Sequence, residues 1–242
     1  MTARATTRLP RIVTDPYRTW FPLVGDRLNA PDLRGVPTAM SAILVVIAAV
    51  EVVRWVLPPE WEQVMIVTLG TRLFELGRFE PTQLYSLFTS WAVHGGVIHA
   101  LFNGLWLLIL GRAAHRHLGN TGLALLFIAT SAAGGLTTAL VHWGQPVVTI
   151  GASGGVFGLI GAAAYFLTGG GTLRRKLARM AAYVAVFMVL NLAFAFVGGA
   201  AFGVSGRIGW EAHAGGLLAG LVLYPLLAAA YGSRRRPPVR PI

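Results

Sequence analysis

Long apolar stretches separated by short polar segments make up most of this chain. A helix needs about 20 apolar residues to cross a hydrocarbon core of roughly 30 Å. Six stretches approach that length, and the fold class they predict is an all-α polytopic membrane protein. We expect the spans near residues 37–57, 97–118, 121–143, 151–168, 178–197 and 210–231.

The composition agrees with a membrane protein. Of the 242 residues, 55% are hydrophobic and only 12% are charged, with a mean hydropathy of +0.64, whereas soluble domains average about 25% charged residues. The net charge of +11 would suggest nucleic acid in a soluble domain. Here the basic residues lie in short blocks between apolar stretches, so we expect no nucleic-acid partner. Cysteine is absent, which excludes disulfides and thiolate chemistry.

The basic blocks also predict how the chain is oriented in the membrane. Cytoplasmic loops carry an excess of Lys and Arg, and sixteen of the twenty basic residues fall on one predicted side. Both termini are on that side, so we expect them in the cytoplasm, in the plasma (inner) membrane. The expected parts are a cytoplasmic N-terminal segment (1–36), a membrane domain (37–231) and a basic cytoplasmic tail (232–242).

Two connections are expected on the outer side. Residues 58–96 mix carboxylates with aromatic side chains, which is typical of a loop half sunk in the membrane interface. Residues 198–206 are rich in glycine, and a mobile lid and a disordered connector are equally compatible with them. The sequence leaves open whether this loop or the fifth span admits a substrate.

Four polar residues are expected at one depth in the membrane. The second, fourth and sixth spans run in the same direction, and the four residues lie within the first two turns of these spans. At a rise of about 1.5 Å per residue they share the outer third of the bilayer. Polar groups in hydrocarbon are costly without a partner or water, so a convergent set is favoured. The four are His99, Asn103, Ser153 and His213.

A serine and a histidine in this set predict nucleophilic catalysis. A serine hydroxyl becomes a nucleophile when a base takes its proton, and histidine is the usual base. We therefore assign Ser153 as nucleophile and His213 as base. The only acidic residue after Ser153 is Glu211, two residues from His213 and thus on a different helix face, which favours a Ser–His dyad.

The remaining polar residues supply candidate donors for an oxyanion. His99 and Asn103 are four residues apart and share one helix face. The backbone N–H of Ser153, at a helix start, can join them. Outside this set, Glu51 and Arg54 are expected to pair because they are three residues apart, and Asn191 is interpreted as structural.

Glycine spacing predicts close packing of the fourth and sixth spans. Gly154 with Gly158, and Gly216 with Gly220, are GxxxG pairs, which let helix backbones approach closely in lipid. Phe157 lies one turn after Ser153 and could pack its ring against the imidazole of the sixth span.

Three segments resemble the signature motifs of the rhomboid intramembrane serine proteases, in that family's order and spans over about residues 37–231. They are Gly151-Ala152-Ser153-Gly154, the stretch from His94 to Asn103, and the stretch from Ala212 to Gly220. The resemblance implies a six-transmembrane-helix rhomboid-like bundle that cleaves transmembrane segments of other proteins just inside the outer interface, without a cofactor. Its partners would be transmembrane substrates and the lipid bilayer.

The resemblance also implies roles for individual residues. Ser153 would be the nucleophile, His213 the base, and His99 and Asn103 oxyanion donors. Phe157 would occupy the family's aromatic position beneath the histidine. Supporting positions would be His94, Gly151, Gly154, Gly216 and Gly220.

This chain departs from the family pattern in two places. Tyr85-Ser86 stands where the family usually has Trp-Arg in the outer loop, and His115 stands where it usually has a glutamate after the second span. Both positions are structural in the family. The departures should therefore affect stability and loop anchoring more than chemistry.

Other functions stay open at this point. A metal-dependent membrane hydrolase would use His94, His99 and His213, although the first two are five residues apart and Glu211 is the only nearby carboxylate. A non-catalytic membrane-protein binder would not need Ser153. Gly-x-Ser-x-Gly also matches the nucleophile elbow of soluble hydrolases, but nothing in the chain predicts the required sheet.

Overall fold

The computed structural model describes residues 35–74, 77–168, 171–193, 195 and 209–232. The predicted segment before residue 35, the basic tail after residue 232 and the glycine-rich loop at 198–206 lie outside the described residues. Within the described ranges the elements are helices, which confirms the all-α fold class. They are α1 (Thr38–Val56), α2 (Pro59–Leu69), η3 (Pro81–Gln83), α3 (Ser86–Thr89), η4 (Ser90–Ala92), α4 (Val97–Val141), α5 (Ser153–Leu167), α6 (Leu173–Ala193) and α7 (Trp210–Tyr231).

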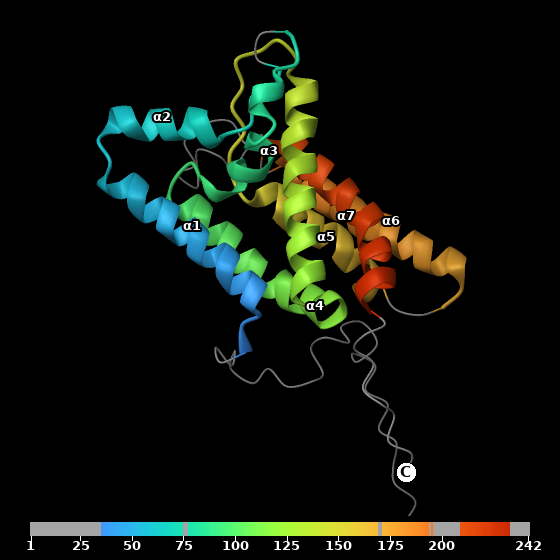
Figure 1. Ribbon diagram of the computed structural model, residues 1–242. Helices are drawn as coiled ribbons and strands as arrows, with labels where there is room; N and C mark the ends of the chain where they lie inside the picture. The colour runs from blue at the N-terminus through green and yellow to red at the C-terminus, as the bar shows by residue number, and fades with distance from the viewer. Residues whose placement is uncertain (1–34, 75–76, 169–170, 194, 196–208, 233–242) are drawn as a thin grey trace, which may run out of the picture. The chain divides into compact units, whose positions relative to one another are not determined.

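Helix α4 is the longest element, with 45 residues. At about 1.5 Å per residue, a straight helix of that length would be roughly twice as long as a hydrocarbon core is thick. Gly119 interrupts it with φ 69° and ψ −173°, a conformation that glycine adopts readily because it has no Cβ. Figure 1 shows α4 as two arms that meet at a sharp bend. The break lies between the second and third predicted spans.

Helix length and composition are the only test of the predicted number of membrane-spanning helices. Among the described residues, four helices are long and apolar enough to cross a membrane, namely α1, α4, α6 and α7, and α5 is apolar but has only 15 residues. The predicted count of six is not confirmed for the described residues. The predicted spans 97–118 and 121–143 form the two arms of one helix bent at Gly119, and α5, with 15 residues, is shorter than a full span.

Helix α5 lies at the centre of the packing, in contact with α4 and α7. Ten of its 15 residues are buried, and most of these are glycine, alanine or small aliphatic residues. A Cβ added at Gly216 would overlap the carbonyl oxygen of Gly154, and one added at Gly220 would overlap that of Gly158. The predicted close approach of the two GxxxG pairs is therefore confirmed.

Short helices make up the connection between α1 and α4. The two residues that depart from the family pattern form their own anchors there. The hydroxyl of Tyr85 donates to the carbonyl oxygen of Thr68 at 2.6 Å, which ties α3 to the end of α2. The carbonyl oxygen of Ser86 accepts from the hydroxyl of Thr71 at 3.0 Å. His115, the other departure, lies partly buried in α4.

Candidate active site

A cavity of about 600 Å³ opens between α4, α5, α6 and α7. Its lining is mostly apolar, with a small group of polar side chains, a composition typical of ligand sites. The four polar residues predicted at one depth, from three different helices, all line it: His99, Asn103, Ser153 and His213.

Ser153 is the first residue of α5 and is more exposed than the buried residues on either side of it. Backbone N–H groups in a first helical turn have no partner within the helix, so the N–H of Ser153 remains available. The preceding turn depends on Gly151, which has φ 113°, a region that favours glycine. A Cβ at Gly151 would lie 2.9 Å from Cε1 of His99 and 3.8 Å from the hydroxyl oxygen of Ser153. Gly151 thus lets the His99 ring approach the turn that carries Ser153.

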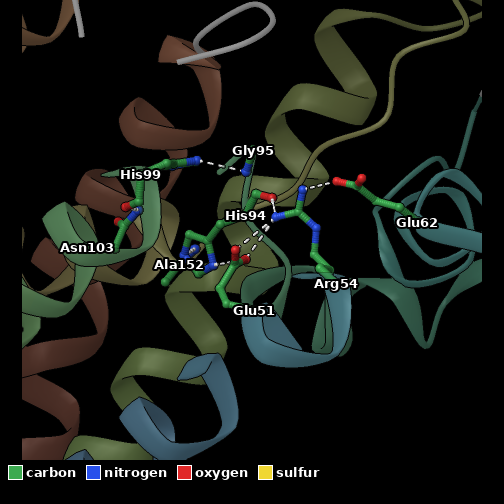
Figure 2. Close-up of polar contacts among 8 residues, drawn as sticks. All are labelled: Glu51, Arg54, Glu62, His94, Gly95, His99, Asn103 and Ala152. Carbon is green, nitrogen blue, oxygen red and sulfur yellow. Dashed lines mark hydrogen bonds and ion pairs between the residues drawn. The ribbon is translucent and has the colours of Figure 1, made fainter. Parts of the chain in front are cut away.

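His99 and Asn103 are arranged as hydrogen-bond donors. The N–H of Gly95 donates to Nδ1 of His99 at 3.3 Å, as Figure 2 shows. A neutral imidazole has one donor and one acceptor nitrogen, so Nε2 of His99 carries the proton. The amide nitrogen of Asn103 donates one hydrogen to the carbonyl oxygen of His99 at 2.9 Å, which leaves its second hydrogen for another acceptor.

His213 is buried and lies flat on Phe157. The ring centroids are 4.3 Å apart and the rings are tilted by only 2°, which confirms the predicted packing of Phe157. Nδ1 of His213 lies 2.5 Å from Oδ1 of Asn191. Between Ser153 and His213 the structure records no direct hydrogen bond; in free enzymes such bonds are often long and tighten when substrate binds.

Asn191 also lines this cavity, although the sequence does not single it out as a site residue. The sequence pattern predicts a structural role for it, and in the fold its side chain contacts the predicted base, His213. A signal was available in the sequence. An amide within an apolar stretch long enough to span a membrane is costly without a polar partner, and such residues are often functional.

His94 supports the turn before Ser153. It is fully buried, and its Nε2 accepts a hydrogen bond from the N–H of Ala152 at 3.2 Å. Burial, and to a lesser extent the nearby His99, lowers the pKa of His94 to about 3, so the ring is neutral. Its proton must then be on Nδ1, which lies 3.9 Å from the carboxylate of Glu51.

An ion-pair network from α1 and α2 holds the loop that contains His94. Arg54 donates to both carboxylate oxygens of Glu51 at 3.0 Å, which confirms the predicted pair. The same guanidinium donates to the carbonyl oxygen of His94 and to Glu62. Figure 2 shows Arg54 between the two carboxylates and the backbone of His94. The network therefore connects α1 and α2 to His94, whose ring accepts from the N–H of Ala152, the residue before Ser153.

A second polar pair lines the same cavity. Glu211 is 2% exposed, and its carboxylate lies 2.9 Å from Nε2 of His142 at the end of α4. His142 is therefore a partner of Glu211. Gln145 lies 3.1 Å from the other ring nitrogen of His142.

The geometry does not favour a metal site. In the part of the chain that the structure describes, no group of three or more His, Cys, Asp or Glu side chains is arranged to hold a metal ion. Two of the three histidines in that alternative already direct a ring nitrogen at a protein partner: His94 at the N–H of Ala152, and His213 at Asn191.

The fold and the cavity define a class of protein, a polytopic helical membrane protein with serine, histidine and asparagine side chains gathered in one cavity between its helices. The Rhomboid domain family matches residues 81–230, well over half of the chain. The chain therefore belongs to the rhomboid family and is an integral membrane protein.

Two similar proteins come from distant organisms. RHOMBOID-like protein 5 of Arabidopsis thaliana is 30% identical over 142 residues, which cover 58% of this chain and 43% of the relative. Rhomboid protease GluP of Bacillus subtilis is 29% identical over 154 residues, which cover 62% of this chain and 28% of the relative. The chain thus spans less than half the length of these two relatives.

Proposed function

We propose that this chain is an intramembrane serine endopeptidase that cleaves transmembrane segments of other membrane proteins near the outer membrane interface. The observation that carries the proposal is that Ser153, His99, Asn103 and His213, from three helices, line one cavity in a bundle of apolar helices. Family membership supports it, and the name of one similar protein is Rhomboid protease GluP.

The proposed reaction has two stages. The hydroxyl oxygen of Ser153 attacks the carbonyl carbon of the scissile peptide bond while Nε2 of His213 takes the hydroxyl proton. The C–N bond then breaks, His213 returns the proton to the leaving amine, and the acyl group remains on Ser153. In the second stage His213 deprotonates a water molecule, whose oxygen attacks the acyl carbon. The ester C–O bond then breaks, His213 returns the proton to the Ser153 oxygen, and the product leaves with a new carboxyl group.

The negative charge that develops on the carbonyl oxygen needs donors aimed at it. The tautomer of His99 that Gly95 selects has its proton on Nε2, beside the turn that carries Ser153. The second amide hydrogen of Asn103 and the N–H of Ser153 complete the proposed oxyanion hole. None of these groups requires a metal ion.

The site also limits the substrate. A peptide bond inside a membrane helix is shielded by the helix backbone, so a substrate must unwind before Ser153 can reach its carbonyl carbon. We expect substrates to have small or helix-breaking residues near their outer membrane boundary.

The membrane arrangement is part of the proposal. We count six spans, with the two arms of α4 on either side of Gly119 as separate spans and α5 as a short central one. The proposed parts remain a cytoplasmic segment (1–36), a membrane domain (37–231) and a cytoplasmic tail (232–242). The protein would lie in the plasma (inner) membrane, with both termini cytoplasmic and the cavity open to the outer side.

The test is cleavage of a model transmembrane substrate by purified protein in liposomes, with the cut position read by mass spectrometry. We expect cleavage by the native chain, in the presence or absence of chelators, and none by Ser153→Ala or His213→Ala. Undiminished cleavage by Ser153→Ala would rule out a serine peptidase. Loss of cleavage with chelators alone would favour a metal-dependent hydrolase, and substrate binding without cleavage would favour a binder.

A further inference from the structure

Asn191 is the one buried residue of α6. Its exposed fraction is 3%, while every other position of this 21-residue helix is partly or fully exposed. Burying an amide costs free energy unless its hydrogen bonds are replaced. The burial of Asn191 should therefore be offset by hydrogen bonds that its amide group makes inside the protein.

Both ends of the Asn191 amide are bonded to α7. Its nitrogen donates to the carbonyl oxygen of Trp210 at 3.2 Å, and its oxygen lies 2.5 Å from Nδ1 of His213. A backbone carbonyl oxygen can only accept, so the NH₂ group of Asn191 must face Trp210 and Oδ1 must face His213. This fixes the orientation of the amide without reference to the imidazole.

The orientation of Asn191 determines the tautomer of His213. Oδ1 carries no hydrogen, so Nδ1 of His213 must be the donor. In the neutral ring Nε2 then has a free lone pair, the state that a general base requires. Stacking on Phe157 holds the plane of the same ring.

We infer that Asn191 is a positioning residue of this site, which orients His213 and holds it in the tautomer whose free lone pair is on Nε2. The inference rests on the proposed function and deepens it, because the Ser–His pair then has a third member from α6. An amide here takes the place that a carboxylate has in Ser-His-Asp enzymes.

A purely structural role for Asn191 is the competing explanation. In that case the two hydrogen bonds only fasten α6 to α7, and their loss lowers stability without changing the chemistry of the molecules that remain folded. Asn120→Leu is a matched control, because the side-chain oxygen of Asn120 accepts a hydrogen bond from the N–H of Ala39 at 3.3 Å and does not line the cavity.

Nuclear magnetic resonance of ¹⁵N-histidine-labelled protein in detergent tests the tautomer directly. We expect the His213 signals of the native chain and of Asn120→Leu to show a protonated Nδ1 and a bare Nε2. In Asn191→Leu, which keeps the size of the side chain and removes the acceptor, we expect a mixture of tautomers. An unchanged His213 tautomer in Asn191→Leu would overturn the inference, and this readout does not depend on proteolysis.

Kinetics per active site, counted by fluorophosphonate labelling of Ser153, tests the consequence for catalysis. General-base catalysis contributes about 10² to 10⁴-fold, so we expect Asn191→Leu to lower kcat at least about tenfold, with a smaller effect on KM. Asn191→Asp restores an acceptor and should recover most of the activity. Its carboxylate favours the charged imidazole, so its activity should also fall at a higher pH on acidification than that of the native chain.

The two proposals can fail separately. Full activity of Ser153→Ala would end the proposed function, while the tautomer of His213 would still report on Asn191. A normal kcat in Asn191→Leu, with an active native chain and an inactive Ser153→Ala, would end only the inference. Equal losses of kcat in Asn191→Leu and Asn120→Leu would likewise assign Asn191 a structural role.

Discussion

Gly216 of α7 packs its backbone directly against the carbonyl group of Gly154, the residue after Ser153. A Cβ at position 216 would overlap that oxygen, as well as the carbonyl carbon and Cα of Gly154. All three are backbone atoms of a central helix, so none can move aside by a rotamer change. The absence of a side chain at Gly216 therefore sets how closely the helix that carries His213 approaches the helix that carries Ser153.

We predict that Gly216→Ala separates α5 from α7 and lowers both stability and activity. Overpacking a close helix contact costs about 1–3 kcal/mol, and the added methyl displaces Ser153 relative to His213. Thermal unfolding in detergent and cleavage of a transmembrane substrate measure the two effects. Gly104→Ala is the control, because its Cβ would make only an ordinary contact, 3.4 Å from Leu44. Equal behaviour of the two variants would contradict the prediction.

Asn103→Ala tests the oxyanion donors. Removing a single donor typically costs 10²–10³-fold in kcat; because His99 and the N–H of Ser153 remain, we expect a loss on the order of 10²-fold or less. The loss should be in kcat more than in KM, because the oxyanion forms only during reaction. An unchanged rate would remove Asn103 from the site.

His213→Ala should be about as damaging as Ser153→Ala, since the two act as a unit.

Contacts that depend on helical periodicity could be predicted from the sequence. The four-residue spacing of His99 and Asn103, and of the GxxxG glycines, determines which side chains share a face whatever the tertiary structure. The position of Phe157 one turn after Ser153 is of the same kind. These relationships require only a helix and an estimate of depth in the membrane.

Contacts that depend on how separate elements dock could not be predicted in this way. Asn191 meets His213 because α6 lies against the start of α7, and nothing in the local pattern around either residue determines that placement. Arg54 contacts the carbonyl oxygen of His94, which lies in a loop. Helical periodicity does not describe the backbone path of that loop. The count of six spans is not confirmed for a related reason: the sequence predicts a break between residues 118 and 121, whereas the two arms form one helix bent at Gly119.

Arg54→Met tests the ion-pair network behind the site. The side chains of Arg54 and Glu51 are only 10% and 12% exposed, so the change leaves a largely buried carboxylate without its partner. Breaking a buried pair costs about 3–5 kcal/mol, and we expect a loss near the lower figure because both groups retain some exposure. Activity should fall with stability, since the backbone of His94 loses its anchor.

Arg78→Met is the matched control for this network. Arg78 also pairs with a carboxylate, that of Glu80, but its side chain is 73% exposed. Exposed pairs contribute about 0–1 kcal/mol, so the control should unfold at nearly the native temperature. If both variants lose the same stability, the network of Arg54 has no special role in holding the loop.

His94 makes the stability of the protein sensitive to acid. Its pKa is about 3 in the folded protein, chiefly because of burial, against 6.5 in an unfolded chain. As the pH falls below 6.5, the unfolded chain binds a proton that the folded protein does not. A group with a lowered folded pKa therefore contributes stability that is fully present above the unfolded pKa and is lost on acidification. The window in which this loss occurs lies between about pH 6.5 and pH 3.

His94→Gln isolates this contribution. Its side-chain oxygen can still accept the N–H of Ala152, but it does not titrate. One proton bound only by the unfolded chain changes the free energy of unfolding by about 1.4 kcal/mol per pH unit, so the native chain should lose about 2 kcal/mol more than the variant between about pH 7 and pH 5. Denaturant unfolding in detergent across this range measures the difference. Parallel curves for the two proteins would mean that His94 is protonated in the folded state and that its ring cannot serve as the acceptor for Ala152.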